Sequence, residues 1–225
     1  MNGAAVARLV RKDGYLHRVP IALMLAGSVA GLLLLLVPGR ATAGIGASLI
    51  LGLFIALTFY LPMSTVLEER SGRTLPFVLS LPVSPAEYVA AKIVVNLLLF
   101  LVPWLAVLGG GILMRGRLPS AQETVPGGYA LVLLGGLLVF FCFVLGFALI
   151  TESTGWTVTL IVASMFLFGN VATQLLPRLP GARTWLEGIA AAAGPLYATL
   201  GTEAAAAGAI LAASFWFQTR KGDFL

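Results

Sequence analysis

Ionisable side chains of both signs crowd into one short run of this chain, Glu68-Glu69-Arg70-Ser71-Gly72-Arg73. Adjacent carboxylates beside arginines can perform acid–base chemistry or form ion pairs with another protein. Other reactive residue types are scarce, because the chain has one histidine, His17, and one cysteine, Cys142. That set does not make the usual zinc sites, and a lone cysteine in an apolar stretch is typical of a small buried side chain. The sequence therefore predicts no metal or cofactor site.

Two common catalytic or nucleotide-binding motifs are also missing. No G-x-x-x-x-G-K-[ST] occurs, so the chain does not bind ATP through a P-loop. No serine stands in G-x-S-x-G, which removes the best-known hydrolase signature. We therefore expect that this chain is not an enzyme, and that the cluster at 68–73 serves recognition.

The composition identifies the environment in which these charges lie. The 225 residues are 59% hydrophobic and 10% charged, and mean hydropathy is +1.00. Soluble domains carry about 25% charged residues. The net charge of +5 is carried by basic residues at the ends of apolar blocks, a pattern that suits membrane lipids rather than nucleic acid. The sequence predicts an all-α integral membrane protein.

Six apolar segments are about as long as the ~20 residues that span a bilayer. They run over 19–37, 44–66, 88–113, 128–150, 156–176 and 198–217. The first exceeds the apolar core of a signal peptide, about 7–15 residues, so we expect it to be retained. We expect a single transmembrane domain over 1–225 with six spans.

The distribution of basic residues predicts the orientation of the spans. Nine lie on the side of the two termini and five on the other, Arg40, Arg115, Arg117, Arg178 and Arg183. The positive-inside rule then places both termini in the cytoplasm of a multi-pass cell-membrane protein. Residues 1–18 form an amphipathic pattern, with Asp13 and His17 interrupting its apolar face. We expect this segment to be an interfacial helix at the inner membrane surface.

Two connections carry local helix signals. The inner one, 67–87, contains a short apolar helix candidate in the run 75–82 and then Ser84-Pro85-Ala86-Glu87, a capping box that should open the third span. Lys92 follows one turn later and should snorkel to the inner headgroups. The outer connection, 177–197, holds a second capping box, Thr184-Trp185-Leu186-Glu187, and should form short helices before the last span.

Small residues and a few polar ones stand out within the spans. Gly27 and Gly31 form a G-x-x-x-G pair, and a four-residue ladder runs through Gly44, Ser48, Gly52 and Ala56, both typical of helix packing in membranes. Polar groups inside a membrane are functional candidates by default, although serine and threonine often bond back to their own helix. These groups are Thr58, Tyr60, Asn96, Thr157, Thr159, Ser164, Asn170 and Glu203.

The inner connection resembles two families. Glu68-Glu69-x-x-x-Arg73 is similar to the E-E-x-x-x-R motif of CAAX-type intramembrane proteases, but those enzymes also need histidines in later spans, and this chain has none after His17. A closer resemblance is to type-2 permeases of ATP-binding-cassette (ABC) transporters. It rests on Glu69, Ser71-Gly72-Arg73-Thr74, the run 79–84, Tyr88-Val89 and Lys92, and on the six-span layout. Unlike some relatives, this chain has no large external domain.

The resemblance to ABC permeases implies partners and roles. Two permease subunits, identical or paralogous, would form the pathway, and separate ATPase subunits would bind below, through a coupling helix within 68–80. The implied ATPase-coupling residues are Glu68, Glu69, Arg70, Gly72, Arg73, Thr74, Phe77 and Leu79. The implied substrate-pathway residues are Thr58, Tyr60, Asn96, Ser164 and Asn170. Most relatives export lipids, glycans, peptides or drugs; an intramembrane enzyme and a non-transporting scaffold subunit are the alternatives.

Overall fold

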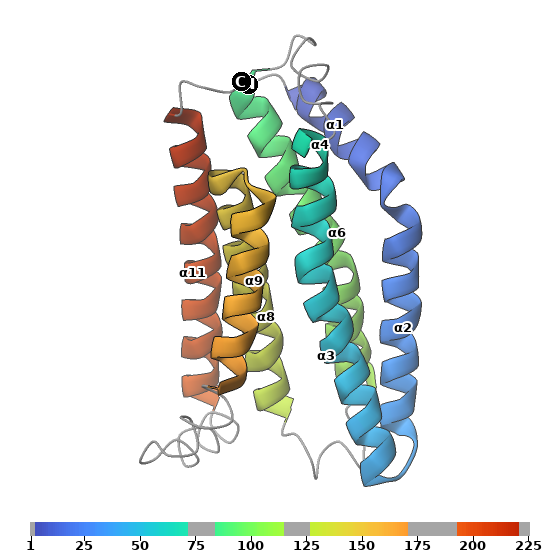
Figure 1. Cartoon of the computed structure of the whole chain (residues 1–225). Coiled ribbons are helices and arrows are strands. Elements are labelled where there is room, and N and C mark those ends of the chain that lie inside the picture. Colours follow the sequence, from blue (N-terminus) through green and yellow to red (C-terminus); the bar gives the residue numbers. More distant parts are fainter. Residues whose placement is uncertain (1–2, 72–83, 115–126, 171–192, 221–225) are drawn as a thin grey trace.

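The computed structural model describes residues 3–71, 84–114, 127–170 and 193–220, and every regular element in these ranges is a helix. Successive long helices run in alternating directions along one bundle (Figure 1). The elements are α1 (Gly3–Leu16), α2 (Arg18–Leu36), α3 (Arg40–Pro62), the π-helical turn η1 (Met63–Leu67), α4 (Glu68–Ser71), α6 (Pro85–Met114), α8 (Gly127–Thr151), α9 (Thr154–Asn170) and α11 (Ala193–Arg220).

Five of these helical segments are long and apolar enough to cross a membrane. They are Arg18–Leu36, Arg40–Leu67, Ala86–Met114, Ala130–Thr151 and Leu196–Arg220. They match the predicted first, second, third, fourth and sixth spans to within a few residues. The predicted fifth span, 156–176, overlaps α9 as far as Asn170, and its remaining residues lie outside the described part of the chain. The six-span layout therefore stays a prediction.

Three phenylalanines from three helices form the centre of the bundle. The rings of Phe100 on α6 and Phe141 on α8 are stacked, with centroids 4.2 Å apart and planes 10° apart. Phe54 on α3 meets Phe100 edge to face at 5.6 Å. All three are buried, and offset aromatic pairs add to the free energy gained from their burial. This contact joins α3, α6 and α8.

Glycines allow α2 and α3 to approach backbone to backbone. A Cβ placed on Gly46 would lie 2.7 Å from the Gly31 carbonyl oxygen, and one on Gly31 would lie 2.6 Å from the Ile50 side chain. The predicted packing role of Gly31 is confirmed, and its partner on α3 is Gly46. Gly44 and Gly52 of the predicted ladder face open space in this chain, with nothing within 4 Å of an added Cβ.

The turn between α8 and α9 is short and is fastened to the last helix. Only Glu152 and Ser153 separate the two helices, and Glu152 adopts a positive φ of 55°, which is uncommon outside glycine. The buried Gln218 side chain of α11 donates to Glu152 Oε1 at 2.9 Å and also to the Leu149 carbonyl. These bonds hold the α8–α9 turn against the end of α11.

Candidate functional site

The helices α1 and α4 and the start of α6 meet at one end of the bundle (Figure 1). Their charged and polar side chains form the polar centre of the molecule. The third-span helix begins there as predicted. Ser84 N donates to Glu87 Oε2 at 2.9 Å, and Glu87 N donates to Ser84 Oγ at 3.3 Å, which is the reciprocal geometry of a capping box. This cap sets the start of α6 at Pro85 and thereby the position of Tyr88 and Lys92, one and two turns later.

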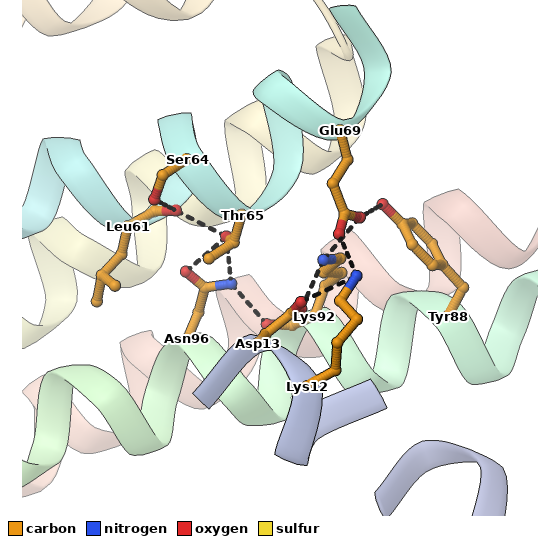
Figure 2. Close-up of polar contacts among 9 residues, drawn as sticks. All are labelled: Lys12, Asp13, Leu61, Ser64, Thr65, Glu69, Tyr88, Lys92 and Asn96. Carbon is orange, nitrogen blue, oxygen red and sulfur yellow. Dashed lines mark hydrogen bonds and ion pairs between the residues drawn. The ribbon is translucent and has the colours of Figure 1, made fainter. Parts of the chain in front are cut away.

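Lys92 does not snorkel to the headgroups, contrary to the sequence prediction. Its side chain is 2% exposed, and Nζ lies 2.6 Å from Asp13 Oδ2 and 2.8 Å from Glu69 Oε2 (Figure 2). An ammonium buried this deeply needs paired anions, because its transfer from water is otherwise very costly. Two carboxylates from α1 and α4 meet that need, so Lys92 joins three elements.

Lys12 completes the group on its more exposed side. Its Nζ lies 2.7 Å from Glu69 Oε1 and 3.2 Å from Asp13 Oδ1. Tyr88 OH donates to Glu69 Oε2 at 3.1 Å, so both carboxylate oxygens of Glu69 are bonded (Figure 2). We call Lys12, Asp13, Glu69 and Lys92 the ionic cluster. Its two cations and two anions balance, which suits a site shielded from water.

The electrostatics favour a charged Glu69. Burial alone would raise the pKa of this carboxyl, but the Lys92 charge and the hydrogen bonds from Lys12 and Lys92 outweigh burial and lower the pKa below its ordinary value. For Lys12, burial lowers the pKa, while the hydrogen bond to Glu69 and the nearby Asp13 charge raise it, and the net pKa is raised. Both shifts keep the pair ionised at neutral pH.

A second polar contact lies beside the ionic cluster and ties α6 to the π-helical turn. Asn96 Nδ2 donates to Thr65 Oγ1 at 2.8 Å and to the Lys92 carbonyl at 2.8 Å. The Thr65 hydroxyl also approaches Leu61 O at 2.7 Å (Figure 2). Asn96 and Thr65 are fully or almost fully buried. π-Helical turns are rare and often mark functional positions, and here the turn aims Thr65 at Asn96.

His17 links the bend between α1 and α2 to the second span. Its Nδ1 lies 3.1 Å from Tyr60 OH, and the two rings meet edge to face at 5.7 Å. Burial lowers the pKa of His17, and the Asp13 charge only partly offsets that effect. The neutral imidazole is therefore the form that this packing favours.

The interrupted apolar face of the first helix is the face that packs on protein. Asp13 and His17 are 3% and 4% exposed, and Leu9 on the same face packs against Tyr88 and Val89 of α6. The sequence prediction treated both polar residues as defects of a membrane-facing surface. They are instead the α1 contribution to the polar centre, and the helix lies with this face on α4 and α6.

The predicted coupling residues lie partly within the described structure. Glu68 and Glu69 open α4, and Glu68 is exposed while Glu69 belongs to the ionic cluster. Arg70 lies in α4, with its side chain outside the described part. Gly72, Arg73, Thr74, Phe77 and Leu79 lie outside the described residues. Most of the outer helical loop predicted at 177–197 also lies outside them, and its last residues, 193–197, belong to α11.

Four of the predicted pathway residues have side-chain hydrogen bonds in the structure. Thr58 is fully buried and donates to Phe54 O at 2.8 Å, and Ser164 donates to Ile161 O at 2.8 Å, so both hydroxyls bond back to their own helices. Tyr60 and Asn96 take part in the polar contacts described above. Asn170 closes α9, with its side chain outside the described part.

Glu203 is a further intramembrane polar group with an unusual setting. It lies on α11 beside Gly135 of α8, where a Cβ would overlap Glu203 Oε2. This oxygen is buried and has no hydrogen-bond partner among the described residues. Gly135 makes room for the carboxyl at the α8–α11 contact.

Comparison with known families gives these features a common context. Residues 38–189, about two thirds of the chain, match the family described as ABC-2 family transporter protein. This chain belongs to the ABC-2 family of transporter proteins. No curated protein and no solved structure matches it significantly. The match covers α3 to α9 and therefore includes Glu69, Lys92 and the inner connection, while α1 and α2 lie before it.

Membership confirms the resemblance drawn from the inner connection. ABC-2 permeases are the membrane components of transporters and are not themselves catalytic. Five apolar helices of spanning length fit a multi-pass membrane protein of this kind. The ionic cluster is thus the polar centre of an ABC-2 permease. It lies where the inner connection begins, and the family resemblance implies that this connection contacts the ATPase.

Proposed function

We propose that this ABC-2 protein is the membrane-spanning subunit of an ATP-driven exporter, and that separate ATPase subunits hydrolyse the ATP. Its cargo is a hydrophobic or amphipathic molecule of the lipid, glycan, peptide or drug type. Two permease subunits, identical or paralogous, form the pathway, and both termini lie in the cytoplasm. The single transmembrane domain spans the cell membrane six times.

The ion pairs of Glu69 are the observation that carries this proposal. Glu69 stands at the start of the segment 68–80 that would contact the ATPase, and its two oxygens are bonded to Lys12, Lys92 and Tyr88. A segment attached in this way transmits its displacement to α1 and α6 together, because Glu69 near its start is bonded to both helices. ATP-driven closure of the ATPases would therefore reach the spans through Glu69.

The π-helical turn supplies a second mechanical element. It joins the second span to α4 directly, and the Asn96–Thr65 bonds tie it to α6 one turn beyond Lys92. The ionic cluster and the Asn96–Thr65 hydrogen bonds together hold the end of the second span against the third. We propose that the residues of these two contacts move as one rigid body during coupling.

We propose that the substrate-pathway residues implied by the family resemblance contact the cargo. On the family analogy the second and fifth spans face the pathway, which makes Thr58, Tyr60, Ser164 and Asn170 candidates, and Asn96 is a candidate as an intramembrane amide. In the conformation described, Thr58 and Asn96 are buried within the chain. We propose that they contact cargo only after the helices around them move.

The enzyme alternative gains no support from the geometry. A general base needs a carboxylate that is free to accept a proton, whereas two lysines and a tyrosine are bonded to Glu69, and the two lysines lower its pKa. His17, the one histidine of the sequence, is also engaged, because its Nδ1 forms a hydrogen bond with the Tyr60 hydroxyl. The described residues hold no group of three or more His, Cys, Asp or Glu suited to a metal ion.

Co-purification tests the proposed function. The tagged chain is isolated in mild detergent from its native membrane, and bound ATPase chains and the ATP hydrolysis rate of the eluate are measured. We expect an ATPase subunit with the wild type, and its loss or uncoupling in Glu69→Ala/Arg73→Ala. Arg117→Ala/Glu123→Ala is the matched control, because it removes one charge of each sign from the outer connection predicted between the third and fourth spans. An eluate without any ATPase, where a known ABC transporter retains its own, would contradict the proposal.

A further inference from the structure

A second face of α1 carries basic and aromatic side chains that the ionic cluster does not use. Arg8, Arg11, Tyr15 and Arg18 are all exposed, and their spacing of three, four and three residues places them along one side of the helix and its bend. The Arg18 guanidinium lies 4.1 Å from the centre of the Tyr15 ring. Among the described residues none of these arginines forms an ion pair. We call these four residues the arginine stripe.

Apolar side chains accompany the arginine stripe into the membrane. Leu16, Val19 and Leu23 are 66%, 60% and 68% exposed, again at spacings of three and four residues. Val19 and Leu23 belong to α2, the first helix long enough to span the bilayer. The arginine stripe therefore lies where an exposed apolar surface begins, which is the level of lipid headgroups.

The charges on this face of α1 indicate which class of ligand it binds. Asp13, the acidic residue of α1, is turned away from the stripe and is bonded to Lys92. Three arginines without a neighbouring carboxylate on their own face attract an anion, and guanidinium groups bind phosphate through paired hydrogen bonds. The exposed side chains of Leu16, Val19 and Leu23 beside them suit contact with acyl chains, which a soluble phosphate compound lacks.

We propose that Arg8, Arg11, Tyr15 and Arg18 bind the phosphate headgroup of an anionic phospholipid, with Leu16, Val19 and Leu23 against its acyl chains. Since Lys12 of α1 is paired with Glu69 and Asp13 of α1 with Lys92, bound lipid would stabilise the position of α1 against the coupling segment. This second consequence rests on the proposed function, whereas the lipid site itself does not.

Lipid titration of the purified chain, followed by native mass spectrometry, tests the site without any ATPase. The probes are phosphatidylglycerol and the zwitterionic phosphatidylcholine. We expect phosphatidylglycerol to bind the wild type at least about tenfold more tightly than phosphatidylcholine. The variant Arg8→Gln/Arg11→Gln/Arg18→Gln should lose this preference. The control Arg115→Gln/Arg117→Gln/Arg178→Gln removes the same charge from the predicted outer connections and should keep it.

Three results would overturn the lipid site. The first is equal loss of preference in both triple variants, and the second is an unchanged preference in the arginine-stripe variant. The third is a loss of dimer in that variant without any change in lipid binding, which would assign the face to a second copy of the chain. If the triple variant does not fold, Arg18→Gln and Tyr15→Leu are titrated singly, and each should weaken phosphatidylglycerol binding. Failure of the co-purification experiment would leave this result unaffected.

Discussion

Lys92 Nζ lies 2.6 Å from Asp13 Oδ2 although 79 residues separate them in the chain, and both side chains are almost completely buried. Glu69 shares the same ammonium at 2.8 Å. One lysine of the third span thus holds both the first helix and the root of the inner connection. Most of what we expect of this permease follows from that arrangement.

Replacing Lys92 should destabilise the fold strongly. Lys92→Met fills a similar volume but leaves the buried Asp13 carboxylate facing only Lys12, at 3.2 Å. Loss of one partner of a buried ion pair costs about 3–5 kcal/mol. Thermal unfolding in detergent, followed by circular dichroism, measures the effect. Arg40→Met, at the exposed start of α3, is the control and should unfold near the wild-type temperature; equal midpoints for both variants would mean that the ionic cluster does not stabilise the fold.

The Asn96–Thr65 contact should show energetic coupling. Asn96→Leu removes the amide, and the Thr65 hydroxyl keeps its bond to Leu61 O, so the cost should be about 1–3 kcal/mol. A double-mutant cycle with Thr65→Val should give an interaction energy of about 0.5–3 kcal/mol. Additive effects of the two substitutions would mean that the bond does not contribute to stability.

Close backbone contact between α2 and α3 makes Gly46 difficult to replace. Gly46→Ala would bring a methyl group against the Gly31 carbonyl, a backbone atom that can move only if a helix moves, and should cost about 1–3 kcal/mol. Gly208→Ala, where nothing lies within 4 Å of the added Cβ, should be neutral or stabilising by up to about 1 kcal/mol. The unfolding midpoint of Gly46→Ala should therefore fall while that of Gly208→Ala stays or rises, and an equal fall of both would argue against a close crossing of α2 and α3 at Gly46.

Acid should weaken the ionic cluster through Glu69. The folded-state pKa of Glu69 lies below the ordinary value of 4.5, so its contribution to stability is complete above pH 4.5 and is lost as pH falls through the folded pKa. Lys12, with its pKa raised above 10.5, loses its contribution only as pH rises beyond that value. The stability advantage of wild type over Glu69→Gln should be constant from pH 6 to 8 and shrink below pH 4.5. An advantage that persists unchanged at pH 3 would contradict the ion pairs.

Much of the fold could be predicted because a bilayer imposes simple rules on sequence. Apolar length located the five spanning helices, and the capping box located the start of α6, since both signals are local. The ionic cluster could not be predicted, because it depends on how α1 packs against residues far along the chain. One signal was present: Asp13 and His17 interrupt the apolar face at positions that a membrane-facing helix would keep apolar.

The surroundings of Lys92 were predicted wrongly for the same reason, because they depend on packing between distant parts of the chain. Its position near the start of an apolar helix is equally compatible with snorkelling and with a buried ion pair, and only the tertiary arrangement distinguishes them. The Gly46 contact was likewise missed because the ladder through Gly44 and Gly52 has the more regular spacing, whereas Gly46 is the α3 glycine that contacts Gly31. Local pattern predicted the helices well and predicted poorly which face of each helix meets which neighbour.

The ATP hydrolysis rate of the intact complex tests the coupling role of Glu69 most directly. The permease and its ATPase subunits are co-purified as wild type, Glu69→Gln and the control Glu123→Gln, and subunit ratios are checked before rates are compared. We predict that Glu69→Gln keeps its bound ATPase but changes the hydrolysis rate by about twofold or more, while Glu123→Gln matches the wild type. A Glu69→Gln complex with the wild-type rate and subunit ratio would contradict the claim that the ionic cluster connects the ATPase to the spans.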